Sequence, residues 1–190
     1  MSRWQPDAPG RLQRAALELY AQRGYDATTV AEIAARAGLT ERTFFRHFAD
    51  KREVLFHGSE QFRDALVAGV QSAPPSASPL ATATFAVESI GPFFDERRAQ
   101  SAQRHAVVSA SLELQERELI KRVSLVATVA EALVERGTAE PVARLAAETG
   151  LTVFSLAYVR WVQDPEERPW SEHVREVAAE LRELAAGATA

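Results

Sequence analysis

Apolar residues recur at intervals of three and four along almost the whole chain, which is the spacing of one face of an α-helix. The first run, from Leu12 to Tyr20, predicts a helix that Gly24 ends. No segment of five or more residues alternates apolar and polar positions with the β-branched or aromatic bias of a strand. The pattern therefore predicts an all-α protein of about nine helices.

Two short helices are expected between residues 29 and 48. Thr29 and Glu32 have the T-x-x-E spacing of a capping box, in which the Thr oxygen accepts a backbone N–H and the Glu carboxylate accepts the N–H of the cap residue. The helix that they open ends at Gly38, and Thr40 is suited to cap the next one. Two short helices joined by a tight turn that contains glycine have the layout of a helix-turn-helix.

The remaining elements are also expected to be helical. Asp50 and Glu53 repeat the capping-box spacing and predict a fourth helix that starts at residue 50. The Pro- and Ser-rich stretch 72–79 cannot continue a helix and is expected to form a long loop. Further helices are expected over residues 80 to about 98, with a kink at Gly91 and Pro92, and over residues 100–109, 112–136, 141–163 and 171–186.

The net charge of -4 is unevenly distributed. Residues 1–57 contain nine Lys and Arg against seven Asp and Glu, whereas residues 58–190 contain 13 against 19. A slightly basic segment on an acidic body is one sign of a module that contacts nucleic acid.

Several classes of protein are disfavoured by composition. Cysteine is absent, which excludes disulfides, a thiolate nucleophile and a zinc site of the Cys type. No apolar run follows Met1, so no signal peptide is expected and the protein is expected in the cytoplasm. Polar residues interrupt every apolar run before it approaches the roughly 20 residues that span a membrane, so no membrane partner is expected.

The second helix of a helix-turn-helix enters the major groove of DNA, whose width admits one helix. Here Phe44 and Phe48 lie one turn apart on the inward face. The side chains expected to point toward base edges are Glu41, Arg42, Phe45 and Arg46. An Arg guanidinium matches the O6 and N7 atoms of guanine. The side chains suited to donate hydrogen bonds to phosphate oxygens are Thr40, Thr43 and His47.

Lys51 is expected in the first turn of the fourth helix, where a cation opposes the helix dipole. This placement is easier to understand if a phosphate lies between Lys51 and the free backbone N–H groups of the helix. The alternative is that these side chains are solvated surface charge and that the short helices are one corner of an ordinary bundle.

Residues 11–55, RLQRAALELYAQRGYDATTVAEIAARAGLTERTFFRHFADKREVL, resemble the N-terminal domain of the tetracycline-repressor (TetR) family of bacterial transcription regulators. The matching motifs are A-A-x-x-L-Y/F-x-x-x-G-Y in the first helix, T-T/V-x-x-I-A-x-x-A-G-L in the second and T-F-F-x-H-F-x-x-K in the third. The resemblance covers about a quarter of the chain. The rest agrees with the family in its helical architecture alone.

The resemblance implies a homodimer whose recognition helices enter successive major grooves of a partly palindromic DNA operator, about 34–36 Å apart. It implies a DNA-binding domain over residues 8–68 and a helical domain for effector binding and dimerisation over residues 69–190. Positions that match base-facing or backbone-facing residues of the family are Glu41, Arg42, Phe45 and Arg46. Positions that match phosphate-facing residues are Thr29, Thr40, Thr43, His47 and Lys51. The chain departs from the family at Phe45, where tyrosine is usual, and at Arg42, where a small residue is frequent.

For the body of the protein, the resemblance implies a dimer interface on the last two helices and an effector pocket among the middle ones. The candidate interface residues are Phe154, Tyr158, Trp161, Val177 and Leu181. The candidate pocket residues, suited to an apolar or amphipathic ligand, are Phe62, Phe85, Glu88, Phe93, Gln103 and His105. For both sets the alternative is ordinary core, since aromatic residues at helical spacing usually pack inside a domain.

Motifs of the common enzyme classes are absent from the sequence, among them G-x-S-x-G, H-E-x-x-H, the phosphate loop and G-x-G-x-x-G. The four histidines are scattered, so neither a metal site nor a cofactor is expected. The sequence therefore favours a DNA-binding regulator, a repressor released by a small effector. The main alternative is a helical scaffold or adaptor that does not bind DNA.

Overall fold

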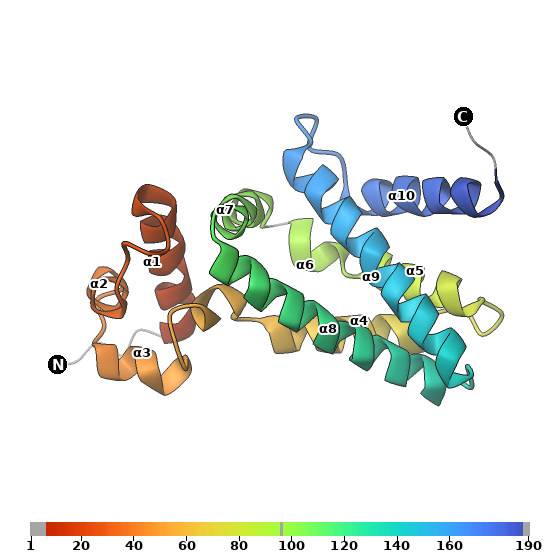
Figure 1. Cartoon of the computed structure of the whole chain (residues 1–190), viewed down its shortest axis with the longest axis horizontal. Coiled ribbons are helices and arrows are strands. Elements are labelled where there is room, and N and C mark those ends of the chain that lie inside the picture. The colour runs from red at the N-terminus through yellow and green to blue at the C-terminus, as the bar shows by residue number, and fades with distance from the viewer. Residues whose placement is uncertain (1–6, 96, 188–190) are drawn as a thin grey trace. The chain divides into compact units, whose positions relative to one another are not determined.

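The computed structural model describes residues 7–95 and 97–187, and within them the chain forms ten α-helices, one 3-10 helix and no strand. The all-α prediction is confirmed. In chain order the elements are α1 (Ala8–Arg23), α2 (Val30–Arg36), α3 (Glu41–His47), the 3-10 helix η1 (Glu53–Phe56), α4 (Ser59–Ser72), α5 (Pro79–Ser89), α6 (Gly91–Asp95), α7 (Arg98–Ser109), α8 (Leu112–Glu135), α9 (Glu140–Gln163) and α10 (Trp170–Ala185), labelled in Figure 1.

The helices divide into two compact units. The first consists of Met1–Ser59 with Gln103–Glu118, and the second of Glu60–Ala102 with Leu119–Ala190. The first unit therefore contains the end of α7 and the start of α8 in addition to α1, α2, α3 and η1. This division differs from the expected one at residues 68 and 69, because helical periodicity does not show which distant helix ends complete a core.

The expected fourth helix from residue 50 is a different element in the structure. Asp50 does cap a turn, since its carboxylate accepts the N–H of Arg52 at 2.8 Å and that of Glu53 at 3.2 Å. The turn is the short 3-10 helix η1, and α4 begins only at Ser59. Gly58 separates the two with a φ of 90°, a left-handed conformation that an α-helix does not contain.

The expected helix over residues 80–98 is also divided. The α5 helix ends at Ser89, and the short helix α6 begins at Gly91. Pro92 has no N–H to donate to the preceding turn, which explains why a break replaces the expected kink.

The core of the first unit forms around α1. Leu12, Ala16, Ile33 and Phe44 are fully buried in it, and Leu114 from the first turn of α8 is equally buried. Val107 and Val108 near the end of α7 belong to the same cluster. Residues far along the sequence are therefore part of the core that supports the short N-terminal helices.

In the second unit, small residues let α5 pack closely between its neighbours. A Cβ atom added to Gly150 of α9 would lie 2.8 Å from the Cβ of Ala83 in α5. A Cβ added to Gly69 of α4 would lie 2.7 Å from the Cα of Ala86 on the same helix α5. Both distances are shorter than any ordinary carbon contact, so the spacing of these helices depends on the two glycines.

A buried carboxylate fixes the corner between α9 and α10. Asp164 accepts the backbone N–H groups of Glu166 and Arg168, both at 3.1 Å, and the Nε of Arg168 at 3.0 Å. Its Oδ2 also lies 3.1 Å from Nε2 of the buried His173. Burial acts to raise the pKa of Asp164, but these hydrogen bonds and the Arg168 charge outweigh it and lower that pKa to about 2.

One helix bears on the expectation that no segment spans a membrane. By length and composition α9 is apolar enough to cross a membrane, with a mean hydropathy of 1.2 over an 18-residue window. A core helix passes the same test, and 39% of that window is buried inside the structure, where α9 packs against α5 and α10.

The contact between Gly150 and Ala83 yields a stability prediction. Gly150→Ala is expected to lower the free energy of unfolding by about 1–2 kcal/mol, because overpacking costs more than the better helix propensity of Ala returns. Adding Ala83→Gly removes the clash and restores the original number of helical glycines, so the double variant is expected to recover most of the loss. Denaturant unfolding of the three proteins measures this, and a double variant no more stable than Gly150→Ala would contradict it.

Candidate nucleic-acid interface

The capping box that opens α2 is confirmed. Thr29 Oγ1 accepts the backbone N–H of Glu32 at 3.3 Å, and Glu32 Oε2 accepts the N–H of Thr29 at 2.9 Å. The hydrogen bonds from Thr29, together with the guanidinium of Arg23, hold the pKa of Glu32 below its usual value. The Thr29 hydroxyl also donates to the Glu32 carboxylate at 2.9 Å, so its hydrogen is already used within the box.

The turn between α2 and α3 is built on Gly38. Its φ of 65° is left-handed, and the next N–H, of Leu39, reaches back to the carbonyl of Ala34 at 2.8 Å. Arg11 of α1 donates to the carbonyl of Ala37 and so satisfies an acceptor at the end of α2. This arrangement closes α2, and the four residues 37–40 connect it to α3 in a tight turn, as a helix-turn-helix requires.

On α3, one face is buried and the other is open. Phe44 is fully buried, and its ring lies 5.4 Å from that of the buried Phe48. Thr40 caps the helix by accepting the N–H of Thr43 at 3.2 Å, and the hydroxyls of these two residues lie 3.0 Å apart. The exposed side chains are Glu41, Arg42, Phe45, Arg46 and His47, as the sequence predicted.

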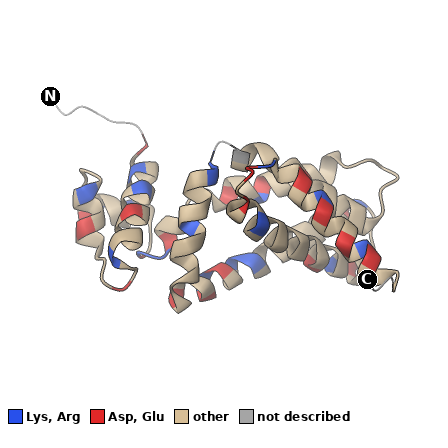
Figure 2. Ribbon diagram, turned by 90° about the horizontal axis from the view of Figure 1, so that it is seen from above, with Lys and Arg blue, Asp and Glu red and all other residues tan. Residues whose placement is uncertain are grey.

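The two arginines of α3 differ from others in the first unit. Arg23 is paired with Glu32 at 2.9 Å, and Arg36 with Glu18 at 2.7 Å. Among the side chains that the structure describes, no carboxylate lies within 4 Å of Arg42 or Arg46, so neither is paired with an acid; Arg46 Nη2 lies 3.4 Å from Nε2 of His47. Basic and acidic residues are interspersed along the helices (Figure 2), so α3 presents positive charge through its unpaired side chains and not through a large basic surface.

Phe45 adds an apolar group to the same face. Its side chain is 55% exposed, and its ring meets Phe44 edge to face at 5.5 Å. A half-exposed ring beside two unpaired guanidinium groups suits contact with a sugar or a thymine methyl group. Without the hydroxyl of the tyrosine usual in the resembling family, it has no hydrogen bond to offer a phosphate.

Lys51 lies elsewhere than expected. It precedes η1 and is not in the first turn of a long helix, so the argument from the helix dipole does not apply. Its Nζ donates to the carbonyls of Tyr25 at 3.0 Å and Thr28 at 3.1 Å and lies 4.1 Å from the centre of the Tyr25 ring. Lys51 therefore holds the turn that leads into α2.

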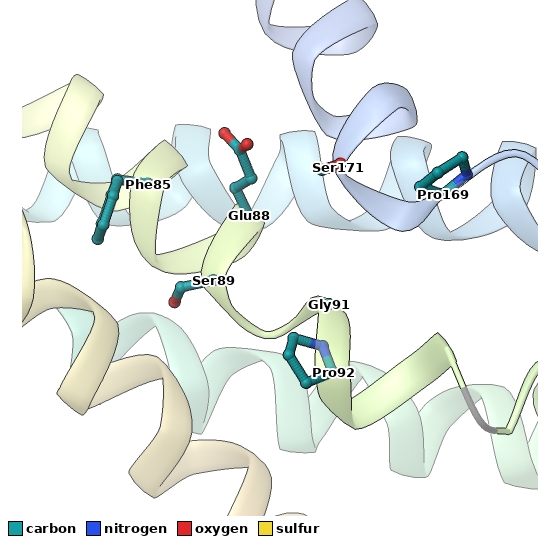
Figure 3. Close-up of a pocket in the computed structure, with 7 residues that line it drawn as sticks. All are labelled: Phe85, Glu88, Ser89, Gly91, Pro92, Pro169 and Ser171. Carbon is teal, nitrogen blue, oxygen red and sulfur yellow. The ribbon is translucent and has the colours of Figure 1, made fainter.

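The six candidate pocket residues do not line one cavity. Phe85 and Glu88 line a depression of about 310 Å³ (Figure 3), together with Ser89, Gly91, Pro92, Pro169 and Ser171. Phe62 and Phe93 pack against each other at 5.6 Å beside the core of the second unit. Gln103 and His105 belong to the first unit.

Two of the five candidate interface residues are wrong. Trp161 is fully buried and Val177 is 3% exposed, because both fill the core of the second unit against residues such as Phe94 and Trp170. Phe154, Tyr158 and Leu181 are half-buried and pack against the same core. The exposed apolar residues of α9 are instead Val142, Leu145 and Leu156.

Comparison with known proteins bears on the N-terminal helices. Residues 12–57 match the family model described as bacterial regulatory proteins, tetR family. Residues 12–57 are therefore similar to that family. The transcriptional regulator TcmR of Streptomyces glaucescens is 41% identical over 70 residues, which are 37% of this chain and 31% of TcmR. The transcriptional activator FasR of Mycolicibacterium smegmatis is 39% identical over 64 residues, 34% of this chain and 29% of FasR. The matched part of this chain thus spans less than a third of the length of either relative.

The fold of the whole chain also has counterparts. The transcriptional regulator FadR of Bacillus subtilis, solved in complex with stearoyl-CoA, superposes with a TM-score of 0.63 over 90% of this chain and 96% of FadR. The two sequences are 17% identical, so the likeness concerns the fold of this chain and not its ligand.

Lys51 and Arg42 yield a matched pair of predictions. Lys51→Met is expected to lower the free energy of unfolding by about 1–3 kcal/mol, because two buried carbonyls lose a charged donor. Arg42→Met removes an exposed, unpaired cation and is expected to change stability by less than about 0.5 kcal/mol. Thermal or denaturant unfolding measures both, and equal losses for the two variants would contradict the structural role of Lys51.

Proposed function

We propose that this protein is a DNA-binding transcriptional regulator of the tetR family. The observation that carries the proposal is the pair of unpaired guanidinium groups of Arg42 and Arg46 on the exposed face of α3, the second helix of a helix-turn-helix. Four residues apart on a helix, they lie on one face, where each is able to pair with the O6 and N7 atoms of a guanine. The alternative is a scaffold or adaptor that does not bind DNA, which would have no need of this arrangement.

The sense of regulation and the effector are part of the proposal. We propose a repressor, as the resemblance to the TetR repressors suggests. FasR, named an activator, makes activation the alternative. A small apolar or amphipathic effector is supported by the partly exposed Phe85 beside the depression in the second unit and by the half-buried Phe62 and Phe93. The stearoyl-CoA bound by the structural neighbour FadR has the same apolar character.

A homodimer that pairs through the outer face of α9 completes the proposal. Leu145 is 68% exposed, and Val142 and Leu156 are each 49% exposed, so this face presents apolar surface of the kind typical of contact sites. Along it, at alternating steps of three and four residues, lie Val142, Leu145, Thr149, Thr152, Leu156 and Val159. From either end of the helix, the residue types along this face follow the same order: Val, Leu, Thr, Thr, Leu, Val.

A dimer with twofold symmetry needs a surface that is complementary to itself. When two α9 helices pair antiparallel with the axis near Gly150, Leu145 faces Leu156 of the partner subunit and Thr149 faces Thr152 of the partner subunit. The Thr149 and Thr152 hydroxyls already donate to carbonyls of their own helix, at 2.8 and 2.9 Å. Pairing therefore does not leave these two hydroxyls without an acceptor. Arg122 Nη2 of α8 donates to Thr152 Oγ1 at 3.2 Å and lies beside the centre of this face.

The DNA-binding proposal is tested by selecting bound fragments from a pool of random duplexes and measuring their affinity. We expect an inverted repeat, and affinity that falls by roughly 10³–10⁵ between 50 and 200 mM salt if six to ten phosphates are contacted. Arg46→Ala is expected to weaken binding to the selected sequence by about 1–3 kcal/mol and to relax the preference at one base pair.

Arg36→Ala is the matched control, because it removes the same charge from an arginine of α2 that Glu18 already neutralises. It is expected to keep the affinity within about twofold and the base preference unchanged. A protein that binds no duplex at low salt would refute the proposal in favour of a scaffold. Equal effects of Arg36→Ala and Arg46→Ala would refute the assignment of the site.

The register of the α9 pair is testable because the chain contains no cysteine. In the double variant Leu145→Cys with Leu156→Cys, mild oxidation is expected to link two subunits through disulfides. Each single variant alone is expected to stay unlinked, because its two cysteines would lie 11 residues, or about 16 Å, apart along the antiparallel helices. Non-reducing electrophoresis of the three variants measures the outcome.

Two results would contradict this dimer. A single variant that links to itself as efficiently as the double variant would indicate a parallel pair or another register. A wild-type protein that sediments as a monomer at micromolar concentration would exclude the pairing. If that monomer bound phosphatidylcholine vesicles, the apolar face of α9 would be a membrane contact.

A further inference from the structure

A hydrogen bond joins the turn before α2 to the start of α8, 88 residues later in the sequence. The hydroxyl of Tyr25 donates to Oε1 of Glu113 at 2.9 Å. Tyr25 is 5% exposed, and burial, together with the Glu113 carboxylate, raises its pKa. The bond is therefore made by a neutral phenol to a carboxylate, which is stronger than a bond between two neutral groups.

The backbone around Tyr25 is what positions α2. The carbonyls of Tyr25 and Thr28 both accept from Lys51 Nζ, and the residue after Thr28 is the cap of α2. Tyr20 fixes Lys51 in turn, since its hydroxyl donates to the Lys51 carbonyl at 2.7 Å and its ring packs edge to face on Tyr25 at 5.3 Å. Tyr25 thus links Glu113 to the first turn of the helix-turn-helix.

Other contacts hold the start of α8 in the first unit. Arg52 Nε lies 3.5 Å from the same Oε1 of Glu113, and Arg117 pairs with Glu53 at the start of η1. Leu114, next to Glu113, is fully buried in the core of this unit. Glu113, Leu114 and Arg117 lie outside the segment 12–57 that matches the family model, so the match does not describe them.

We propose that Glu113 is a positioning residue for DNA binding: from α8 it holds the Tyr25 turn, and through that turn it sets the orientation of α2 and of the recognition helix α3. The inference rests on the proposed function. It identifies a side chain that does not face DNA and on which the affinity for DNA depends. The physical basis is that binding groups must be held in place by residues whose own positions are fixed.

The test uses the full chain and the duplex selected by the wild-type protein. Glu113→Ala and Tyr25→Phe are each expected to weaken DNA binding about three- to tenfold, which is part of the contribution of one hydrogen bond to a charged group. The double variant is expected to bind no more than about twofold more weakly than the more affected single variant, because both changes remove the same bond. Glu113→Gln keeps an acceptor oxygen and is expected to restore part of the affinity.

Glu116→Ala is the matched control, since it removes the same charge from an exposed residue one turn further along α8. Its affinity is expected to equal that of the wild type. Amide hydrogen exchange separates positioning from general destabilisation: in Glu113→Ala it should become faster over residues 30–36 and stay unchanged over α10. Tyr25→Phe keeps the ring beneath Lys51, so a folded variant is available even if Glu113→Ala does not fold.

Wild-type affinity in folded Glu113→Ala or in Tyr25→Phe would overturn the inference and leave the proposed function standing. Faster exchange throughout both units would also overturn it, because the residue would then act on overall stability. Failure of the wild-type protein to bind any duplex would instead refute the proposed function itself.

Discussion

The burial of a single aromatic ring fixes the surface on which the proposed function depends. A helix of seven residues is not stable in water by itself, so α3 forms because the surrounding unit holds it. Phe44 is fully buried and packs on Phe48, which fixes the rotation of α3 about its own axis. Because successive residues of a helix are about 100° apart, this rotation places Arg42 and Arg46 on the open side. The chemistry of the outer face follows from the packing of the inner one.

The charged side chains of the first unit also fall into two groups: some hold the fold together, and others are available to contact a ligand. Surface ion pairs such as Arg36 with Glu18 contribute little to stability, so leaving Arg42 and Arg46 unpaired costs the fold little. Lys51 and Glu113 are different, since each binds a polar group of the buried Tyr25, which would otherwise lack a partner. Cations that support the fold are thus bound to backbone or carboxylate oxygens, and cations available to a ligand are not.

The sequence allowed correct prediction wherever the deciding interaction is local. The box of Thr29 with Glu32 and the glycine turn at Gly38 involve neighbouring residues, and the structure has both. The cap at Asp50 was also predicted, but the 3-10 form of η1 and the break at Gly58 before α4 were not.

Long-range contacts could not be predicted in this way. No local pattern indicates that Tyr25 meets Glu113, or that the first unit needs the start of α8 to complete its core. Spacing alone likewise did not distinguish the buried Trp161 from residues at a surface. The limit lies in periodicity itself, which shows that a face is apolar and not what covers it.

That limit is clearest in α9, which is apolar on two sides for different reasons. Its inner side is made of small residues, including Ala147 and Gly150, that allow close packing on α5. Its outer side carries larger residues such as Leu145 and Leu156, which no part of residues 7–95 and 97–187 buries. A helix of this kind has the hydropathy of a membrane span although much of it lies in a core. Only the order of residues on its outer side, the same in both directions, favours a second copy of the chain over lipid, because a bilayer requires no such symmetry.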